Sequence, residues 1–293
     1  MALNLPVFYQ RTASAIVFAA VMLVGLLWRA DAFLALIVVI NVLCLREYFR
    51  LMKRIDTETY WPLWLEIVVQ IFSIIILITG CGWCVGCTEI GDPPLFEITR
   101  DIIRTVRGLS QLVFVLPAII IIIGIVSSKN ITKAVFLSIG GLFYITLPMI
   151  FLLFMKDISD LLPIALIVMI WINDTMAYLV GSFIGKTPFS AISPKKTWEG
   201  TGGGALLTMI GAMIYGYFSH KFRLIDWAVL ALCAGVAGTL GDLVESKLKR
   251  IANVKDSGTM MPGHGGALDR FDSLLLAAPF AGTYVIVFMM HGK

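Results

Sequence analysis

Apolar runs long enough to cross a bilayer recur along almost the entire chain, and this pattern limits the folds that are open to it. A helix needs about 20 predominantly apolar residues to cross the hydrocarbon core of a membrane. Hydrophobic residues make up 59% of the 293-residue sequence and charged residues only 14%. A soluble fold must wet its outer face and could not bury this much apolar surface. The sequence therefore predicts an all-α, polytopic integral membrane protein.

Nine apolar runs predict membrane spans, and the second of them, residues 32–45, is the shortest because Asp31 and Arg46 bracket it. It could cross the membrane with snorkelling flanks, or it could form a shallow hairpin with the first span. The first run has no small-residue cleavage site before Arg29 and is interpreted as a retained span rather than a cleaved signal. The nine runs that predict spans fall near residues 12–28, 32–45, 61–84, 110–127, 134–154, 161–182, 202–218, 226–244 and 273–290.

Lysine and arginine are distributed unevenly between the two sides of these spans. Fifteen of the 23 lie in connections on the N-terminal side, which the positive-inside rule places in the cytoplasm. We therefore expect a multi-pass protein of the cell membrane, the inner membrane in a bacterium, with a cytoplasmic N-terminus. The net charge of +4 is modest and argues against nucleic acid as a partner.

The predicted spans divide the chain into two regions. An N-terminal region, residues 1–133, holds four spans, and a C-terminal region, residues 134–293, holds five. The two most polar loops of the second region, 183–201 and 245–272, are both expected on the cytoplasmic side, where nucleotides are found.

Parts of the N-terminal region admit two interpretations each. The stretches 46–54 and 95–107 could be interfacial helices that meet lipid headgroups, or simply surface anchors. Glu66 and Gln70, one helical turn apart, could be functional or form a hydrogen-bonded packing pair. The third case is a C-x2-C-x2-C run without a nearby fourth ligand, which favours a small-residue helix end over a metal cluster. This run consists of Cys81, Cys84 and Cys87.

Polar residues of an unusual kind concentrate in the C-terminal region. Asn173 and Asp174 lie within the sixth predicted span, where a carboxylate is costly unless it is paired or bound to a cation. Beyond that span, Lys195 and Lys196 precede the glycine-rich stretch 201–204. Two lysines beside such a backbone indicate a phosphate cradle at a helix N-terminus. The alternative is a positive-inside loop followed by a small-residue packing face.

Acidic residues pair at helical spacing after the eighth predicted span. Asp242 and Glu245 are three residues apart, as are Asp269 and Asp272, so each pair projects from one face of a helix. Clustered carboxylates at a membrane boundary are destabilised unless a cation joins them, and oxygen ligands favour Mg²⁺. Interleaved basic residues suit metal-assisted phosphoryl or nucleotidyl transfer. A merely solvated loop fits this density of Gly, His, Asp, Lys and Arg less well.

At these residues the sequence resembles the phosphatidate cytidylyltransferases, also called CDP-diacylglycerol synthases. Their signature reads approximately S-x-apolar-K-R-x4-K-D, a small residue, and then apolar-P-x-H-G-G-x-x-D-R-x-D. The stretch 246–272 matches it almost position by position, with mild departures at Met261 and Ala267. The stretch 193–200 is similar to a second motif of the family. The first 130 residues show no diagnostic match.

The resemblance implies transfer of CMP from CTP to phosphatidate, giving CDP-diacylglycerol and pyrophosphate. It also implies Mg²⁺, a second monovalent cation such as K⁺, and a homodimer. We expect the metal ligands to be Asp242, Asp269 and Asp272. Besides the last two, the expected catalytic residues are His264, Arg270, Lys249 and Arg250. The expected substrate-binding residues are Ser193, Lys195, Lys196, Asn173, Asp174, Lys255, Gly265 and Gly266.

Two other functions compete with this interpretation. A transporter or channel would use the intramembrane Asp residues to line an ion path, but the long HGG-containing loop has no partner in the other half of the chain. A polyprenol kinase, or a cytidylyltransferase for ether lipids, would also use CTP and would be distinguished by product analysis.

Overall fold

The structure is a computed structural model that describes residues 5–80, 122, 129–260 and 265–290. Within these ranges the regular secondary structure is helical, and isolated bridge residues occur outside the helices, among them the antiparallel pair Pro188 and Thr197. Six helical segments are long and apolar enough to cross a membrane: Ala30–Ile55, Leu63–Gly80, Ile131–Ile158, Leu161–Ile184, Leu224–Ile251 and Leu268–Met289. The prediction of an all-α, multi-pass membrane protein is therefore confirmed.

Each of these six segments overlaps one of the predicted spans. In addition, α1 (Leu5–Leu27) covers the first predicted span, and α9 (Trp198–Ser219) covers the predicted span 202–218. The predicted span 110–127 lies outside the described residues, apart from Ile122. The total of nine membrane spans stays a prediction.

The second predicted span proves longer than expected. α2 (Ala30–Ile55) is one continuous helix of 26 residues, so residues 46–54 are its C-terminal part and not a separate interfacial helix. Tyr48 and Phe49 are buried there. Charged residues end the apolar run, but Leu, Arg, Glu, Met and Lys all favour helix. The other interfacial candidate, 95–107, and the Cys81, Cys84 and Cys87 run lie outside the described residues.

The chain divides into two compact units. The first consists of Met1–Asp157 with Asp256–Leu268, and the second of Ile158–Lys255 with Asp269–Lys293. The boundary falls later than the sequence division at residue 133, and part of the C-terminal signature segment packs with the N-terminal helices.

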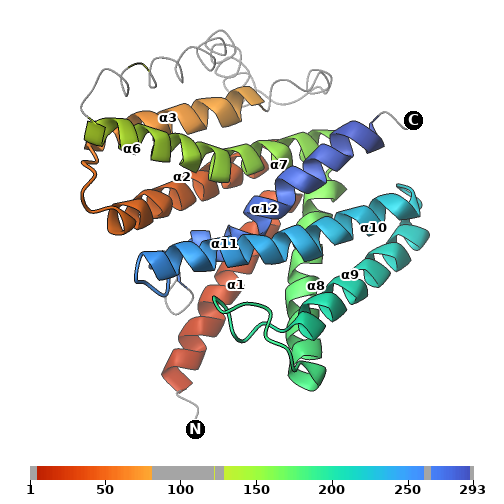
Figure 1. Cartoon of the computed structure of the whole chain (residues 1–293). Helices are drawn as coiled ribbons and strands as arrows, with labels where there is room; N and C mark the ends of the chain where they lie inside the picture. Colours follow the sequence, from red (N-terminus) through yellow and green to blue (C-terminus); the bar gives the residue numbers. More distant parts are fainter. Residues whose placement is uncertain (1–4, 81–121, 123–128, 261–264, 291–293) are drawn as a thin grey trace. The chain divides into compact units, whose positions relative to one another are not determined.

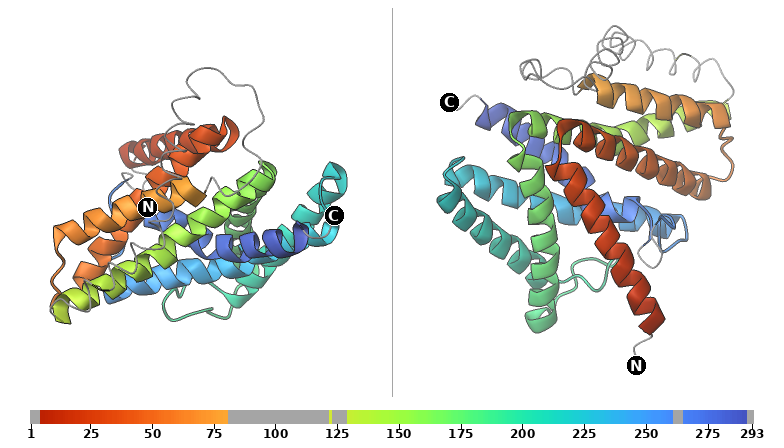
Figure 2. Two further views of the ribbon diagram at one scale, coloured as in Figure 1. Left: turned by 90° about the horizontal axis from the view of Figure 1, so that it is seen from above. Right: turned by 180° about the vertical axis from the view of Figure 1, so that it is seen from behind.

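In the first unit, α2 packs against α1, α3 (Leu63–Gly80) and α6 (Lys129–Gly141) (Figures 1 and 2). α6 continues through a π-helical turn, η1 (Leu142–Thr146), into α7 (Leu147–Ile158). The core between these helices is apolar and includes Cys44, Leu45, Phe49, Leu65, Ile145 and Met149.

Glu66 and Gln70 join α3 to α2. Glu66 forms an ion pair with Lys53, and the Gln70 amide donates a hydrogen bond to the Val42 carbonyl oxygen at 3.2 Å. Both contacts join α3 to its neighbour α2, which favours the packing interpretation of this pair.

In the second unit, α8 (Leu161–Ile184) packs along α9 (Figure 2). The close approach depends on glycine: a Cβ atom added at Gly204 would lie 2.8 Å from the Ala177 Cβ atom. α10 (Leu224–Leu232), the π-helical turn η2 (Cys233–Ala237) and α11 (Gly238–Ile251) form one long helix. α12 (Leu268–Tyr284) ends in the π-helical turn η3 (Val285–Met289).

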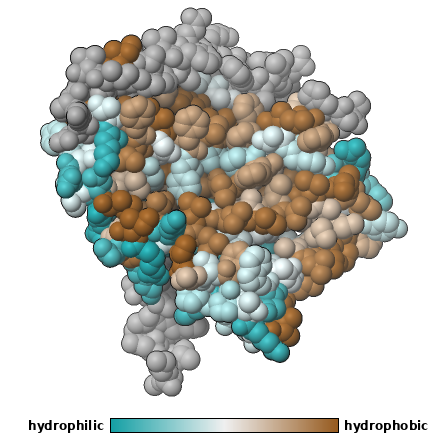
Figure 3. Space-filling model, viewed as in Figure 1, coloured by the Kyte–Doolittle hydropathy of each residue, from teal (hydrophilic) through white to brown (hydrophobic). Residues whose placement is uncertain are grey.

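Apolar side chains also cover much of the outer surface, as the brown colour in Figure 3 shows. Large hydrophobic residues are widely exposed, including Phe143 at 66%, Phe183 at 81% and Phe218 at 74% of their surface. In water such a surface would aggregate, whereas hydrocarbon solvates it. The surface therefore agrees with a bilayer environment.

Candidate active site

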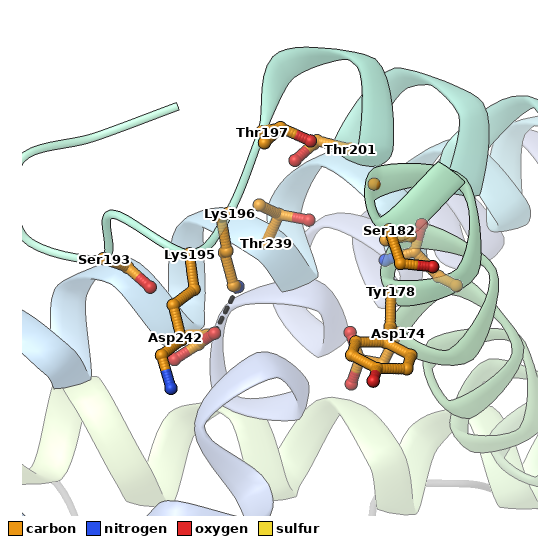
Figure 4. A pocket seen from close by; sticks show the side chains of 13 residues that line it. Asp174, Tyr178, Ser182, Ser193, Lys195, Lys196, Thr197, Thr201, Thr239 and Asp242 are labelled. Carbon is orange, nitrogen blue, oxygen red and sulfur yellow. Dashed lines mark ion pairs between the residues drawn. The ribbon is translucent and has the colours of Figure 1, made fainter. Parts of the chain in front are cut away.

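A pocket of about 450 Å³ lies in the second unit, a volume within the usual range for small-molecule sites. Figure 4 shows residues of α8, including Asp174 and Tyr178, on one side and Ser193, Lys195 and Lys196 of the following loop on the other. Lys196 forms an ion pair with Asp242 of α11. The complete lining consists of Asn173, Asp174, Ala177, Tyr178, Gly181, Ser182, Ser193, Lys195, Lys196, Thr197, Thr201, Thr239 and Asp242.

The loop that carries the two lysines folds back on itself. Pro188 and Thr197 form an antiparallel bridge, and the Phe189 N–H donates to the Lys196 carbonyl oxygen at 2.7 Å. The Phe189 ring also meets the Trp198 ring edge-on, with centroids 4.4 Å apart. The fold-back presents the segment with Ser193 and both lysines to the pocket.

Glu199 clips the base of this loop. Its carboxylate accepts hydrogen bonds from the Lys186 N–H at 3.2 Å, the Thr187 N–H at 3.2 Å and the Thr187 hydroxyl at 2.8 Å. Hydrogen bonds from its own backbone N–H and from Thr187 lower the pKa of Glu199 to about 2. Thr197 caps α9 next to it, accepting from the Gly200 N–H at 3.1 Å. The clip is therefore ionised at neutral pH.

Three carboxylates meet beside the pocket. Oxygen atoms of Asp242 and Glu245 from α11 and of Asp272 from α12 all lie within 4.8 Å of one another. The two helices approach closely here because position 241 is glycine: a Cβ atom added at Gly241 would lie 2.5 Å from the Asp272 carbonyl oxygen. We refer to these three residues as the acidic cluster.

Lys249 links the acidic cluster to Asp269. Its ammonium group lies 2.5 Å from a Glu245 oxygen and 2.6 Å from an Asp269 oxygen. Glu245 is fully buried and the Lys249 side chain is only 13% exposed. A buried ion pair of this kind depends on its partners, since removing one leaves an uncompensated charge.

The donor set of the acidic cluster fits a hard divalent cation. Its three residues offer only carboxylate oxygens, which Mg²⁺ prefers. Lys196 and Lys249 already pair with Asp242 and Glu245, and a divalent cation would add positive charge where the three carboxylates come together.

The sequence prediction named Asp242 and Asp272 as ligands, and the structure brings these two together. The third member of the cluster is Glu245, and the spacing of three from Asp242 is the signal that could have identified it. Asp269 lies next to the cluster, because Lys249 pairs with both Glu245 and Asp269. The expected role of Asp269 as a metal ligand stays a prediction.

The remaining predicted residues are distributed unevenly. Of the predicted substrate-binding residues, Asn173, Asp174, Ser193, Lys195 and Lys196 line the pocket. Lys255 is exposed and does not line it, and the same holds for the predicted catalytic residues Arg250 and Arg270. Gly265 and Gly266 belong to the first unit, and His264 lies outside the described residues.

The fold and this site define a class: a multi-pass helical membrane protein whose second unit joins a lysine-bearing loop to an acidic cluster. The chain belongs to the cytidylyltransferase family, which matches it over residues 9–288. The family resemblance of the two sequence motifs is thereby confirmed.

Several curated relatives carry the name phosphatidate cytidylyltransferase. The chain is 44% identical to one from Synechocystis sp. over 124 residues, which cover 41% of each protein. It is 47% identical to one from Bacillus subtilis over 115 residues, covering 39% of this chain and 43% of the relative. One from Staphylococcus aureus is 44% identical over 120 residues, covering 40% of this chain and 46% of the relative. The chain thus matches less than half the length of each of these relatives.

Proposed function

We propose that this protein transfers CMP from CTP to phosphatidate, giving CDP-diacylglycerol and pyrophosphate. The observation that carries the proposal is the ion pair between Lys196 and Asp242, which joins a basic loop to the acidic cluster in a member of the cytidylyltransferase family. The relatives named phosphatidate cytidylyltransferase support the choice of lipid substrate.

Lys195 and Lys196 would bind the phosphates of CTP, since both line the pocket and ammonium groups form strong charge-assisted bonds with phosphate. Asp242, Glu245 and Asp272 would hold Mg²⁺, which when bound supplies positive charge against the phosphate oxygens. Asn173 and Asp174 would close the polar pocket from within the membrane. Lys249 would hold Asp269 and Glu245 in place.

The reaction needs positioning more than it needs a base. A phosphate oxygen of phosphatidate attacks the α-phosphorus of CTP, and the bond from that phosphorus to the oxygen bridging the β-phosphate breaks. Pyrophosphate leaves with the electron pair of that bond. The attacking oxygen is already anionic near neutral pH, so no general base has to remove a proton. The barrier lies in bringing polyanions together, which oriented cationic groups lower.

The two substrates reach such a site from different phases. Phosphatidate would enter sideways from the leaflet, and CTP from the aqueous side that carries the loop 183–201. The excess of Lys and Arg on that side supports a cytoplasmic location of the loop.

The test is product formation by the purified protein in mixed micelles containing phosphatidate and Mg²⁺. CTP is supplied in two preparations, labelled either at the α-phosphate or at the γ-phosphate. Cytidylyl transfer places only the α-label in the lipid, and omission of Mg²⁺ abolishes it. The γ-label in lipid would show a CTP-dependent kinase instead. Label transfer to an ether lipid or a polyprenol phosphate, but not to phosphatidate, would reject the proposed acceptor.

A further inference from the structure

A carboxylate in the N-terminal region holds part of the C-terminal signature segment. Glu47 of α2 is only 6% exposed. It accepts hydrogen bonds from the Ser257 hydroxyl at 2.7 Å, the Ala267 N–H at 3.0 Å and the Leu268 N–H at 2.8 Å. All four residues belong to the first unit. One buried side chain thus binds residues more than 200 positions away, on both flanks of the stretch 258–266.

Two of these donors lie where α12 begins. Leu268 is the first residue of that helix, and the first N–H groups of a helix lack partners within it. A negative charge at this end also interacts favourably with the helix dipole. Glu47 therefore caps α12 with a side chain from a distant helix, and Asp269 and Asp272 follow in the first two turns.

Glycines at both ends of the stretch 258–266 leave room for the Glu47 carboxylate. A Cβ atom added at Gly258 or at Gly266 would meet a Glu47 oxygen in hard contact. Ser257 and Gly266 are buried, as Glu47 is. Both glycines thus leave the space in which the carboxylate reaches the backbone.

We propose that Glu47 is a positioning residue for cytidylyl transfer: by binding Ser257 and the N–H groups of Ala267 and Leu268, it fixes the start of α12, the helix that carries Asp269 and Asp272. This inference rests on the proposed function. It gives the N-terminal helices a role in the reaction, although the first 130 residues carry no family motif.

The role requires a carboxylate rather than any polar side chain. One oxygen of Glu47 accepts from the Ala267 N–H and the other from Ser257 and the Leu268 N–H. In Glu47→Gln, the new amide N–H₂ group would face one of the two backbone donors, whichever way the amide is turned. An unsatisfied buried donor is costly. The isosteric substitution thus removes one of the acceptors that Glu47 provides, while it preserves the volume of the side chain.

The first test is steady-state kinetics of Glu47→Gln beside Glu66→Gln. The control makes the same change in a part-buried carboxylate of the first unit, which pairs with Lys53 and contacts none of the three donors. We expect kcat to fall about tenfold or more in Glu47→Gln, the equivalent of one lost charge-assisted bond. KM for CTP should stay near that of Glu66→Gln, and the thermal unfolding midpoint should fall by roughly a few degrees, because a buried donor loses its acceptor. An unchanged kcat in folded Glu47→Gln would overturn the proposal.

The second test is hydrogen exchange, which does not depend on the substrates. We expect the Ala267 and Leu268 amides to exchange about tenfold or more faster in Glu47→Gln than in the wild-type protein or in Glu66→Gln. Equal exchange would overturn the inference even if CDP-diacylglycerol is made. If wild-type protein makes no CDP-lipid while these amides lose protection, the proposed reaction fails but the anchoring by Glu47 stands.

A double-mutant cycle provides the last check and does not require Glu47→Ala to be fully stable. Gly258→Ala should displace the Glu47 carboxylate and accelerate exchange at Ala267 and Leu268. In the Glu47→Ala background the carboxylate is absent, so Gly258→Ala should have little further effect. Additive effects of the two substitutions would contradict the proposed contact.

Discussion

Lys196 forms an ion pair with Asp242, and the same aspartate belongs to the acidic cluster with Glu245 and Asp272. The two side chains are 29% and 28% exposed, so the pair is open to solvent on the pocket side. Its position implies an exchange of partners when substrate binds: Lys196 would bind the CTP phosphates, and Asp242 would bind a cation. The site would then keep its charges compensated both before and after the substrate binds.

Replacement of the pocket lysine should weaken nucleotide binding. In Lys196→Ala we expect KM for CTP to rise about tenfold or more, because a charge-assisted contact to phosphate is lost. Lys53→Ala, which breaks a comparable ion pair with Glu66 in the first unit, should leave KM for CTP unchanged. Steady-state kinetics with each substrate varied in turn measure both values. A change confined to KM for phosphatidate would reassign Lys196 to the lipid.

Glu245 is the member of the acidic cluster that the sequence prediction did not include as a ligand. Glu245→Gln should raise the Mg²⁺ concentration needed for half-maximal activity by about tenfold or more, because one carboxylate is lost from the donor set. Glu66→Gln, at a part-buried glutamate of the first unit that also pairs with a lysine, provides the control. Magnesium titration of the initial rate makes the comparison. Equal Mg²⁺ requirements in the two variants would remove Glu245 from the proposed metal site.

The Glu199 clip should survive mild acid. Folding lowers the pKa of this carboxyl from roughly 4.3 in an unfolded chain to about 2. A lowered pKa contributes stability that is complete above the unfolded value and is lost as the pH falls towards 2. The Lys186 and Thr187 amides should therefore stay protected from hydrogen exchange at pH 4, where an ordinary glutamate is already more than half protonated.

In Glu199→Gln the same amides should exchange faster at every pH from 4 to 8, and KM for CTP should rise, since the lysine loop loses its anchor. Wild-type protection that already disappears between pH 5 and pH 4 would contradict the assigned pKa shift. Protection unchanged by the substitution would contradict the clip itself.

The glycines of α9 are predicted to differ in their tolerance of alanine. A Cβ atom at Gly204 would lie 2.8 Å from Ala177 of α8, whereas at Gly202 it would meet nothing within 4 Å. Gly204→Ala should therefore cost about 1–3 kcal/mol through overpacking. Gly202→Ala should be neutral or stabilise the helix by about 0.5–1 kcal/mol. Thermal unfolding in detergent measures both, and equal effects would contradict the close packing of α8 on α9.

Much of this protein could be predicted from local sequence. The apolar runs predict the spanning helices, because in a bilayer every backbone group must be satisfied within its own helix. The spacing of Asp242 and Glu245 predicts that both project from one helix face, as they do. The C-terminal end of α2 was misjudged because charged residues end an apolar run without ending a helix.

What could not be predicted depends on contacts between residues that are distant in the chain. The meeting of Asp272 with Asp242 and Glu245, and the pairing of Asp269 with Lys249, depend on how α11 and α12 pack, which spacing within one helix does not determine. Glu47 carries no local signal at all, since its three donors lie more than 200 residues further along the chain.

The most direct test of the central claim is Mg²⁺-dependent transfer of the CTP α-label to phosphatidate by purified Asp242→Asn, compared with wild-type protein and Asp31→Asn. Asp31 is a half-exposed aspartate of the first unit, 3.9 Å from Arg29. We predict transfer by the wild-type protein and by Asp31→Asn. Asp242→Asn should lose about a hundredfold or more of it, as expected when a group that stabilises developing charge is removed, while keeping its unfolding midpoint. Near-normal, Mg²⁺-dependent transfer by folded Asp242→Asn would contradict the assignment of the acidic cluster to the reaction.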